Sequence, residues 1–178
     1  MVMTALVMGL IMLATATFKI PSPFTQGYVH LGDTMIFLGV LVLGKKNGTI
    51  AAGIGSALAD IMAGYAIYAP WTLIIKALMA LVMGLFIEVM TKCGKTNLRI
   101  AGIPIVEIVG MAIAGVIMAA GYCVVDGVLA GNMAAGLLGV TANIGQFVVG
   151  MVLATALAAA LYKTPAKKYC AYRIDEVR

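Results

Sequence analysis

The chain alternates long apolar runs with short polar stretches, and this pattern predicts an all-α membrane protein. A helix needs about 20 mostly apolar residues to cross the hydrocarbon of a bilayer, so a chain of 178 residues has room for about six such helices. We therefore expect a six-transmembrane-helix bundle that forms a single integral membrane domain over residues 1–178, with a basic tail over 163–178. The predicted helices cover residues 2–18, 32–44, 49–65, 70–91, 101–124 and 133–162.

Composition agrees with this pattern. Hydrophobic residues make up 63% of the chain and charged residues only 11%, whereas soluble domains are about 45–50% apolar and about 25% charged. The net charge of +5 would suggest nucleic acid in a soluble protein, but here we interpret it as a topology signal and expect no nucleic-acid partner. The three cysteines lack the spacing of a metal site, so we expect free thiols.

The basic residues are unevenly divided between the two sets of predicted connections. One set, with the tail, holds Lys45, Lys46, Lys92, Lys95, Arg99, Lys163, Lys167, Lys168, Arg173 and Arg178. The other set holds only Lys19. Under the positive-inside rule we expect both chain ends to be cytoplasmic, in a multi-pass protein of the cell membrane.

Charged side chains occur inside the predicted spans, where they are costly and usually mark a functional site. Asp60 and Lys76 each lie about six residues, or roughly 9 Å, from the outer end of consecutive antiparallel helices, so we expect them to pair. The alternative is a purely structural ion pair. Asp33 opens the predicted helix 32–44, where the helix macrodipole alone would favour a carboxylate.

Other polar and aromatic residues are predicted at the same outer end of the bundle, where we expect a cavity that opens to the exterior. Asn143 and Gln146 are three apart and share a helix face. Trp71 can stack on a ligand, or can belong to an interfacial aromatic belt. His30 either closes over a ligand or is an exposed loop residue. Together with Asp33, Asp60 and Lys76, these residues suit a small aromatic heterocycle bearing hydroxyl and ring-nitrogen groups.

The chain has no Walker A motif and no HExxH or CxxC pair, so we expect no ATP hydrolysis by this chain, no metal and no cofactor. On the helix 2–18, Ala5 and Gly9 form a small-xxx-small face that serves ordinary packing or the docking of another subunit. A small membrane enzyme and an assembly partner without ligand remain alternatives at this stage.

Three motifs resemble the S components of energy-coupling factor (ECF) vitamin transporters. They are the HLGD sequence of residues 30–33, a small-residue series that leads to an Ala-Asp pair, and the PxTLIIK sequence of residues 70–76. The series consists of Gly48, Ala52, Ser56, Ala59 and Asp60. The similarity covers most of the chain and is closest to the riboflavin, pyridoxine and hydroxymethylpyrimidine branch.

The resemblance implies a six-helix subunit that binds a vitamin at its outer side and is not an enzyme. Such a subunit docks on a transmembrane coupling protein with two cytosolic ATPases, which drive uptake. Family members dock through small residues on the first helix, often AxxxA, and Ala5 with Gly9 departs from that pattern at the second position. The implied ligand is pyridoxine or hydroxymethylpyrimidine, with riboflavin or another vitamin as the alternative.

Overall fold

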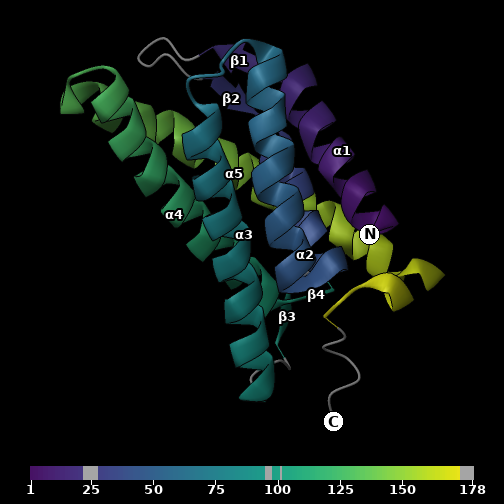
Figure 1. Ribbon diagram of the computed structural model, residues 1–178. Helices are drawn as coiled ribbons and strands as arrows, with labels where there is room; N and C mark the ends of the chain where they lie inside the picture. The colour runs from purple at the N-terminus through teal and green to yellow at the C-terminus, as the bar shows by residue number, and fades with distance from the viewer. Residues whose placement is uncertain (22–27, 95–97, 101, 173–178) are drawn as a thin grey trace.

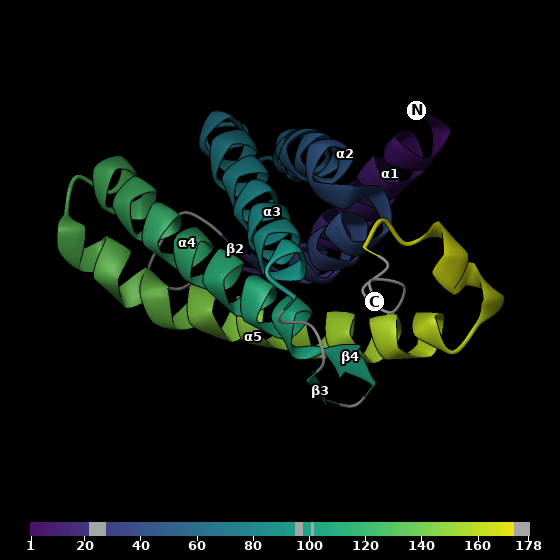
Figure 2. The same cartoon turned by 90° about the horizontal axis from the view of Figure 1, so that it is seen from below.

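The computed structural model describes residues 1–21, 28–94, 98–100 and 102–172 and is a bundle of helices (Figure 1). The helices are α1 (Val2–Thr17), α2 (Gly32–Ala63), α3 (Ala69–Lys92), α4 (Ile105–Leu129) and α5 (Met133–Tyr162). Neighbours in the chain pack in sequence order, and α5 also returns to α2, so that α2, α3, α4 and α5 enclose a common interior (Figure 2).

Helix α2 is a sharply bent element that contains two of the predicted helices. Gly44 has φ 75° and ψ 176°, a backbone conformation essentially reserved for glycine, and it interrupts the helix there. Gly39 and Gly55 both pack near Ile11 of α1, although 16 residues of straight helix would separate them by about 24 Å. The chain therefore reverses at Gly44, and residues 45–48, which separate the predicted helices 32–44 and 49–65, are helical.

Most other predicted helix limits are close to the observed ones. Helix α5 matches the prediction of 133–162, and α3 extends the predicted 70–91 by one residue at each end. The prediction of 101–124 is wrong at both ends: its first residue lies outside the described residues, α4 begins at Ile105, and α4 continues to Leu129. Gly102, with φ 85°, turns the chain between β3 (Arg99–Ile100) and β4 (Ile103–Pro104).

The segment expected as a loop over 19–31 contains a second small sheet. Strand β1 (Lys19–Pro21) pairs antiparallel with β2 (Tyr28–His30), with Lys19 opposite His30. This sheet lies at the top of the bundle in Figure 1, while the N-terminus lies lower down. It places Tyr28 and His30 over the helices at that end.

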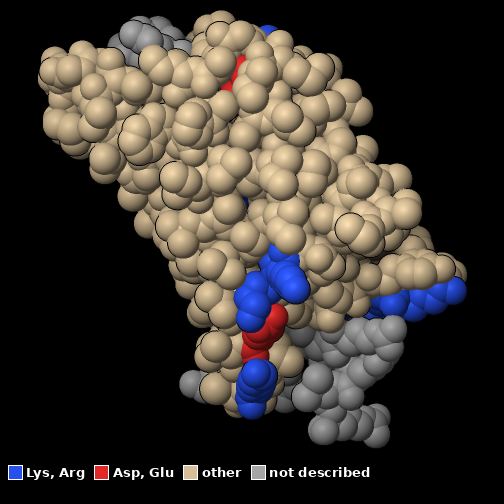
Figure 3. All heavy atoms as spheres, in the orientation of Figure 1, with Lys and Arg blue, Asp and Glu red and all other residues tan. Residues whose placement is uncertain are grey.

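By length and composition, four of the described helices could cross a membrane, namely α2, α3, α4 and α5, and α1 is apolar but shorter. Large apolar side chains such as Leu137, Val148 and Val152 remain exposed on the outside of α5. Lys and Arg side chains gather at the lower end of the molecule, opposite the β1–β2 sheet (Figure 3). At that end the basic tail forms the 3-10 helix η1 (Pro165–Tyr169), and residues 173–178 lie outside the described part.

Candidate functional site

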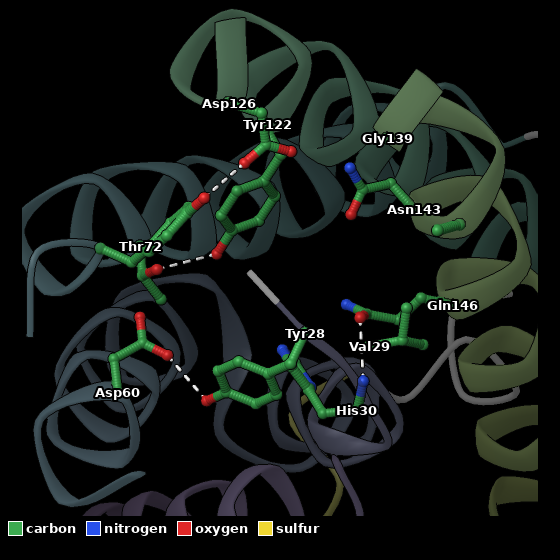
Figure 4. Close-up of a pocket in the computed structure, with 12 residues that line it drawn as sticks. Tyr28, Val29, His30, Asp60, Thr72, Tyr122, Asp126, Gly139, Asn143 and Gln146 are labelled. Atoms are coloured by element: carbon green, nitrogen blue, oxygen red, sulfur yellow. Dashed lines mark hydrogen bonds between the residues drawn. The ribbon is translucent and has the colours of Figure 1, made fainter. Parts of the chain in front are cut away.

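A pocket opens beneath β2, between the second half of α2 and helices α3, α4 and α5. Its empty space is about 470 Å³, part of which is open to the surroundings. The lining residues are Tyr28, Val29, His30, Asp60, Tyr68, Thr72, Tyr122, Asp126, Gly139, Ala142, Asn143 and Gln146. Figure 4 shows their polar groups converging from five different elements on one space.

One wall of the pocket is built around Asp60. The Tyr28 hydroxyl donates to Asp60 Oδ1 at 2.8 Å, whereas Asp60 Oδ2 is buried without a hydrogen-bond partner among the described residues. Next to it, Tyr122 donates to Thr72 Oγ1 at 3.0 Å, so the Thr72 hydroxyl proton is left to interact with the neighbouring Asp60 carboxylate (Figure 4). This wall therefore presents a carboxylate to the pocket, and Oδ2 retains lone pairs for a ligand donor.

The opposite wall contains the second carboxylate. Tyr68 donates to Asp126 Oδ1 at 2.9 Å, and Asn143 projects its amide beside it from α5 (Figure 4). Gly139 and Ala142 line the pocket on the same face of α5. Glycine has no side chain and alanine only a methyl group, which leaves room in front of the Asn143 amide. Asp126 lies in α4 and not in the connection between the predicted helices 101–124 and 133–162, so the sequence-based site left it out.

Gln146 connects the pocket to a fully buried network behind it. Its Oε1 accepts from the His30 backbone N–H at 3.0 Å, and its Nε2 donates to Asp33 Oδ2 at 2.8 Å. A carboxylate can only accept, so these two partners fix which end of the amide faces which way. Gln146 keeps one proton and one lone pair, which are available to a ligand.

Lys76 belongs to this buried network and not to the pocket surface. It donates to Asp33 Oδ1, and neither side chain of this salt bridge is exposed. The predicted Asp60–Lys76 pair is therefore wrong: the hairpin at Gly44 brings the start of α2 back beside α3, and Asp33 is the partner. The Tyr122 ring, which lines the pocket, makes a cation–π contact with Lys76, with the ring centroid 5.4 Å from Nζ.

His30 is a buried residue and not an exposed loop residue. Its Nδ1 accepts from the Gly32 backbone N–H at 3.0 Å, which requires that nitrogen to be unprotonated. Burial, with a smaller contribution from the Lys76 charge, lowers the pKa of His30 to about 3. Burial and the neighbouring Asp60 carboxylate raise the pKa of Tyr28 well above its usual value, so both side chains are neutral at pH 7.

The predicted site residues thus fall into three groups. His30, Asp60, Asn143 and Gln146 line the pocket; Asp33 and Lys76 lie behind it. Trp71 is 42% exposed and is not among the lining residues, although its neighbour Thr72 is. The sequence-based site left out four polar lining residues, namely Tyr28, Thr72, Tyr122 and Asp126. Asp126 lies just past the predicted helix 101–124, whereas Tyr122 lies inside it, where an aromatic side chain carries no signal of a site. Among the described residues no group of His, Cys, Asp and Glu could hold a metal ion.

The proposed docking pair lies away from the pocket. Ala5 is exposed and Gly9 half-buried on α1, whose buried face is formed by Val7, Ile11 and Thr15. A side chain added at Gly9 would meet nothing within 4 Å. This face of α1 therefore has no partner within the described part of the chain.

Comparisons with known proteins identify the family. Residues 1–163 match the sequence model of the family described as ECF-type riboflavin transporter, S component. An uncharacterised protein from Pyrococcus woesei is 37% identical over 117 residues, which are 66% of this chain and 71% of the relative. The thiamine precursor transporter HmpT of Lactococcus lactis subsp. cremoris is 28% identical over 148 residues, 83% of this chain and 78% of the relative.

The family match covers nearly the whole chain, including every helix that lines the pocket. The expectation that this chain is not an enzyme is confirmed, since S components are transporter subunits. The apolar helices likewise agree with a multi-pass protein of the cell membrane. The protein belongs to the family of ECF-type transporter S components, which serve vitamin uptake.

Proposed function

We propose that this S component captures pyridoxine or hydroxymethylpyrimidine in the pocket beneath β2. The observation that carries the proposal is the acceptor-rich lining, in which the Asp60 and Asp126 carboxylates and the Asn143 and Gln146 amides face one space. Both compounds are single rings with hydroxyl, amino or ring N–H donors around the rim, which match such acceptors. Tyr28 and Tyr122 supply aromatic faces on which a ring can stack.

The alternative ligand is riboflavin, which the name of the matching family mentions. Its flavin edge is rich in acceptors and therefore suits N–H donors better than carboxylates. The HmpT relative, named as a thiamine precursor transporter, favours hydroxymethylpyrimidine, at 28% identity.

In this proposal the chain is one membrane domain with six crossings, and both ends are cytoplasmic. The reversal at Gly44 supports two crossings within α2, and the gathering of Lys and Arg opposite the β1–β2 sheet supports the orientation (Figure 3). The pocket then opens to the exterior. The unpartnered face at Ala5 and Gly9 supports docking on a transmembrane coupling subunit, which works with two cytosolic ATPase subunits.

The test is ligand-dependent thermal stabilisation of the purified chain in detergent against pyridoxine, hydroxymethylpyrimidine, riboflavin and thiamine. A ligand that binds only the folded state raises the free energy of unfolding by about 2.7 kcal/mol when its concentration is 100 times its dissociation constant. We expect stabilisation by pyridoxine or hydroxymethylpyrimidine, and loss of it in Asn143→Leu, whereas Glu88→Gln at the opposite end keeps it. Stabilisation by riboflavin alone would select the alternative ligand, and no stabilisation would refute the proposed site.

A further inference from the structure

The acidic residues that line the pocket have no basic counterpart among the described lining residues. Asp60 and Asp126 line it, 4% and 5% exposed, and no Lys or Arg is among the described lining residues. The sequence itself limits where a cation could come from, because it has no Lys or Arg between Lys19 and Lys45 or between Arg99 and Lys163. Between Lys46 and Lys92 there is only Lys76.

Neither remaining cation balances the two carboxylates. The Lys76 charge is already neutralised by Asp33 in a salt bridge with no exposed side-chain surface. Lys19 is exposed on β1 and does not line the pocket. His30 is neutral, since its Nδ1 accepts from the Gly32 N–H. The described part of the pocket lining therefore holds no cation that could balance an added anion, and charge interactions are weakly screened inside an apolar bundle.

One oxygen in this pocket has room for a further donor. Asp60 Oδ1 accepts from Tyr28, and the Thr72 hydroxyl lies near enough to interact with the same carboxylate, but the buried Oδ2 accepts no hydrogen bond of normal length within the described part of the chain. A buried carboxylate oxygen without a donor is costly, so a ligand N–H or O–H placed there gains a charge-assisted hydrogen bond. The same oxygen repels an anion.

We propose that this pocket selects its ligand by charge: it binds a neutral or protonated nitrogen heterocycle with a donor on Asp60 Oδ2, and it rejects the phosphate ester of the same compound. The inference rests on the proposed function and adds the ionic form of the ligand. A phosphomonoester carries nearly two negative charges at pH 7 and would meet Asp60 and Asp126 with no cation to balance it.

The experiment compares matched alcohol and ester pairs by titration calorimetry on the purified chain. The pairs are pyridoxine with pyridoxine 5′-phosphate, and hydroxymethylpyrimidine with its phosphate. We expect the ester to bind at least about tenfold more weakly than the alcohol, because like charges in contact are strongly unfavourable. Asp60→Asn and Asp126→Asn should each lower this ratio, while Glu88→Gln, an acid outside the pocket, should leave it unchanged.

Each outcome decides between the two proposals. An ester that binds as tightly as its alcohol overturns charge selection and leaves the proposed function intact. A ratio that persists in both pocket variants also overturns it, because the discrimination would then be steric. The comparison in the unmodified chain needs no variant to fold, and Asp126→Asn can replace Asp60→Asn if the latter does not fold. Absence of binding by every alcohol overturns both proposals.

Discussion

Lys76 on α3 and Asp33 at the start of α2 form a salt bridge that is sealed from both the pocket and the surroundings. They are 43 residues apart, and Gln146 on α5 completes the network by donating to the other Asp33 oxygen. Three elements are thereby joined behind the pocket. In the proposed function the pair influences binding through Gln146, whose amide it orients, and not by contact with the ligand.

Removing the ammonium should destabilise the fold strongly. Lys76→Met leaves the Asp33 carboxylate buried without its counter-ion, so we expect a loss of about 3–5 kcal/mol of unfolding free energy. The matched control is Lys45→Met: Lys45 pairs with Glu88, and both side chains are about one-third exposed, so the expected loss is about 0–1 kcal/mol. Denaturant titration in detergent measures both. Equal losses in the two variants would contradict the buried role of Lys76.

Substitution of the two amide residues on α5, Gln146 and Asn143, should affect stability and ligand binding differently. Gln146→Leu leaves Asp33 Oδ2 and the His30 N–H without this partner, so we expect about 1–3 kcal/mol lower stability together with weaker ligand binding. Asn143→Leu should weaken binding while stability stays within about 0.5 kcal/mol. Calorimetric titration and thermal unfolding of both variants provide the comparison. Normal stability of Gln146→Leu would show that the network is not needed for folding.

Trp71 should not take part in binding. Its side chain is 42% exposed and does not line the pocket, so Trp71→Phe should change the dissociation constant by no more than about twofold. Tyr122→Leu removes a lining ring and the hydroxyl that binds Thr72, and should weaken binding about tenfold. The compound that binds in the thermal panel is the probe. A large effect of Trp71→Phe would restore the stacking role that the sequence suggested.

Stability should fall as the pH is lowered, because of His30. Its pKa is about 3 in the folded protein and about 6.5 when unfolded, so the unfolded chain binds more protons between these values. The His30 contribution is complete above pH 6.5 and declines as the pH falls towards 3, by about 2 kcal/mol between pH 7 and pH 5. Unfolding measured across this range in His30→Asn should show a flatter dependence. If the pH dependence of stability in His30→Asn equals that of the unmodified chain, other titratable groups cause the dependence.

The reversal in α2 should depend on glycine at residue 44. Gly44→Ala places a side chain in a conformation that L residues avoid and brings it within 3.1 Å of the Ala171 Cβ, so we expect a loss of about 1–3 kcal/mol. Gly9→Ala is the control, for which we expect a gain in stability. Gly9 lies in a helix with open space around it, so the substitution should stabilise the protein by about 0.5–1 kcal/mol. Thermal unfolding of each variant measures the difference. A neutral Gly44→Ala would mean that the bend tolerates another geometry.

The sequence alone determined the local features. Apolar runs bounded by Gly, Pro and polar residues gave α3 and α5 nearly to the residue, because helix length and ends depend on neighbouring positions. The i, i+3 spacing placed Asn143 and Gln146 on one face, and both line the pocket. The motif that contains His30 and the one that ends at Asp60 also marked pocket residues.

Only the tertiary structure decided how these elements face one another. A helix that is apolar on all sides carries little information about its rotation, so the sequence did not show that Trp71 points outward while Thr72 lines the pocket. Depth along a helix predicted Asp60 as the partner of Lys76, but pairing depends on which segments touch. The reversal at Gly44 brings Asp33 to Lys76 instead, and the extra helical turn that carries Asp126 into the pocket depends on contacts between α4 and its neighbours.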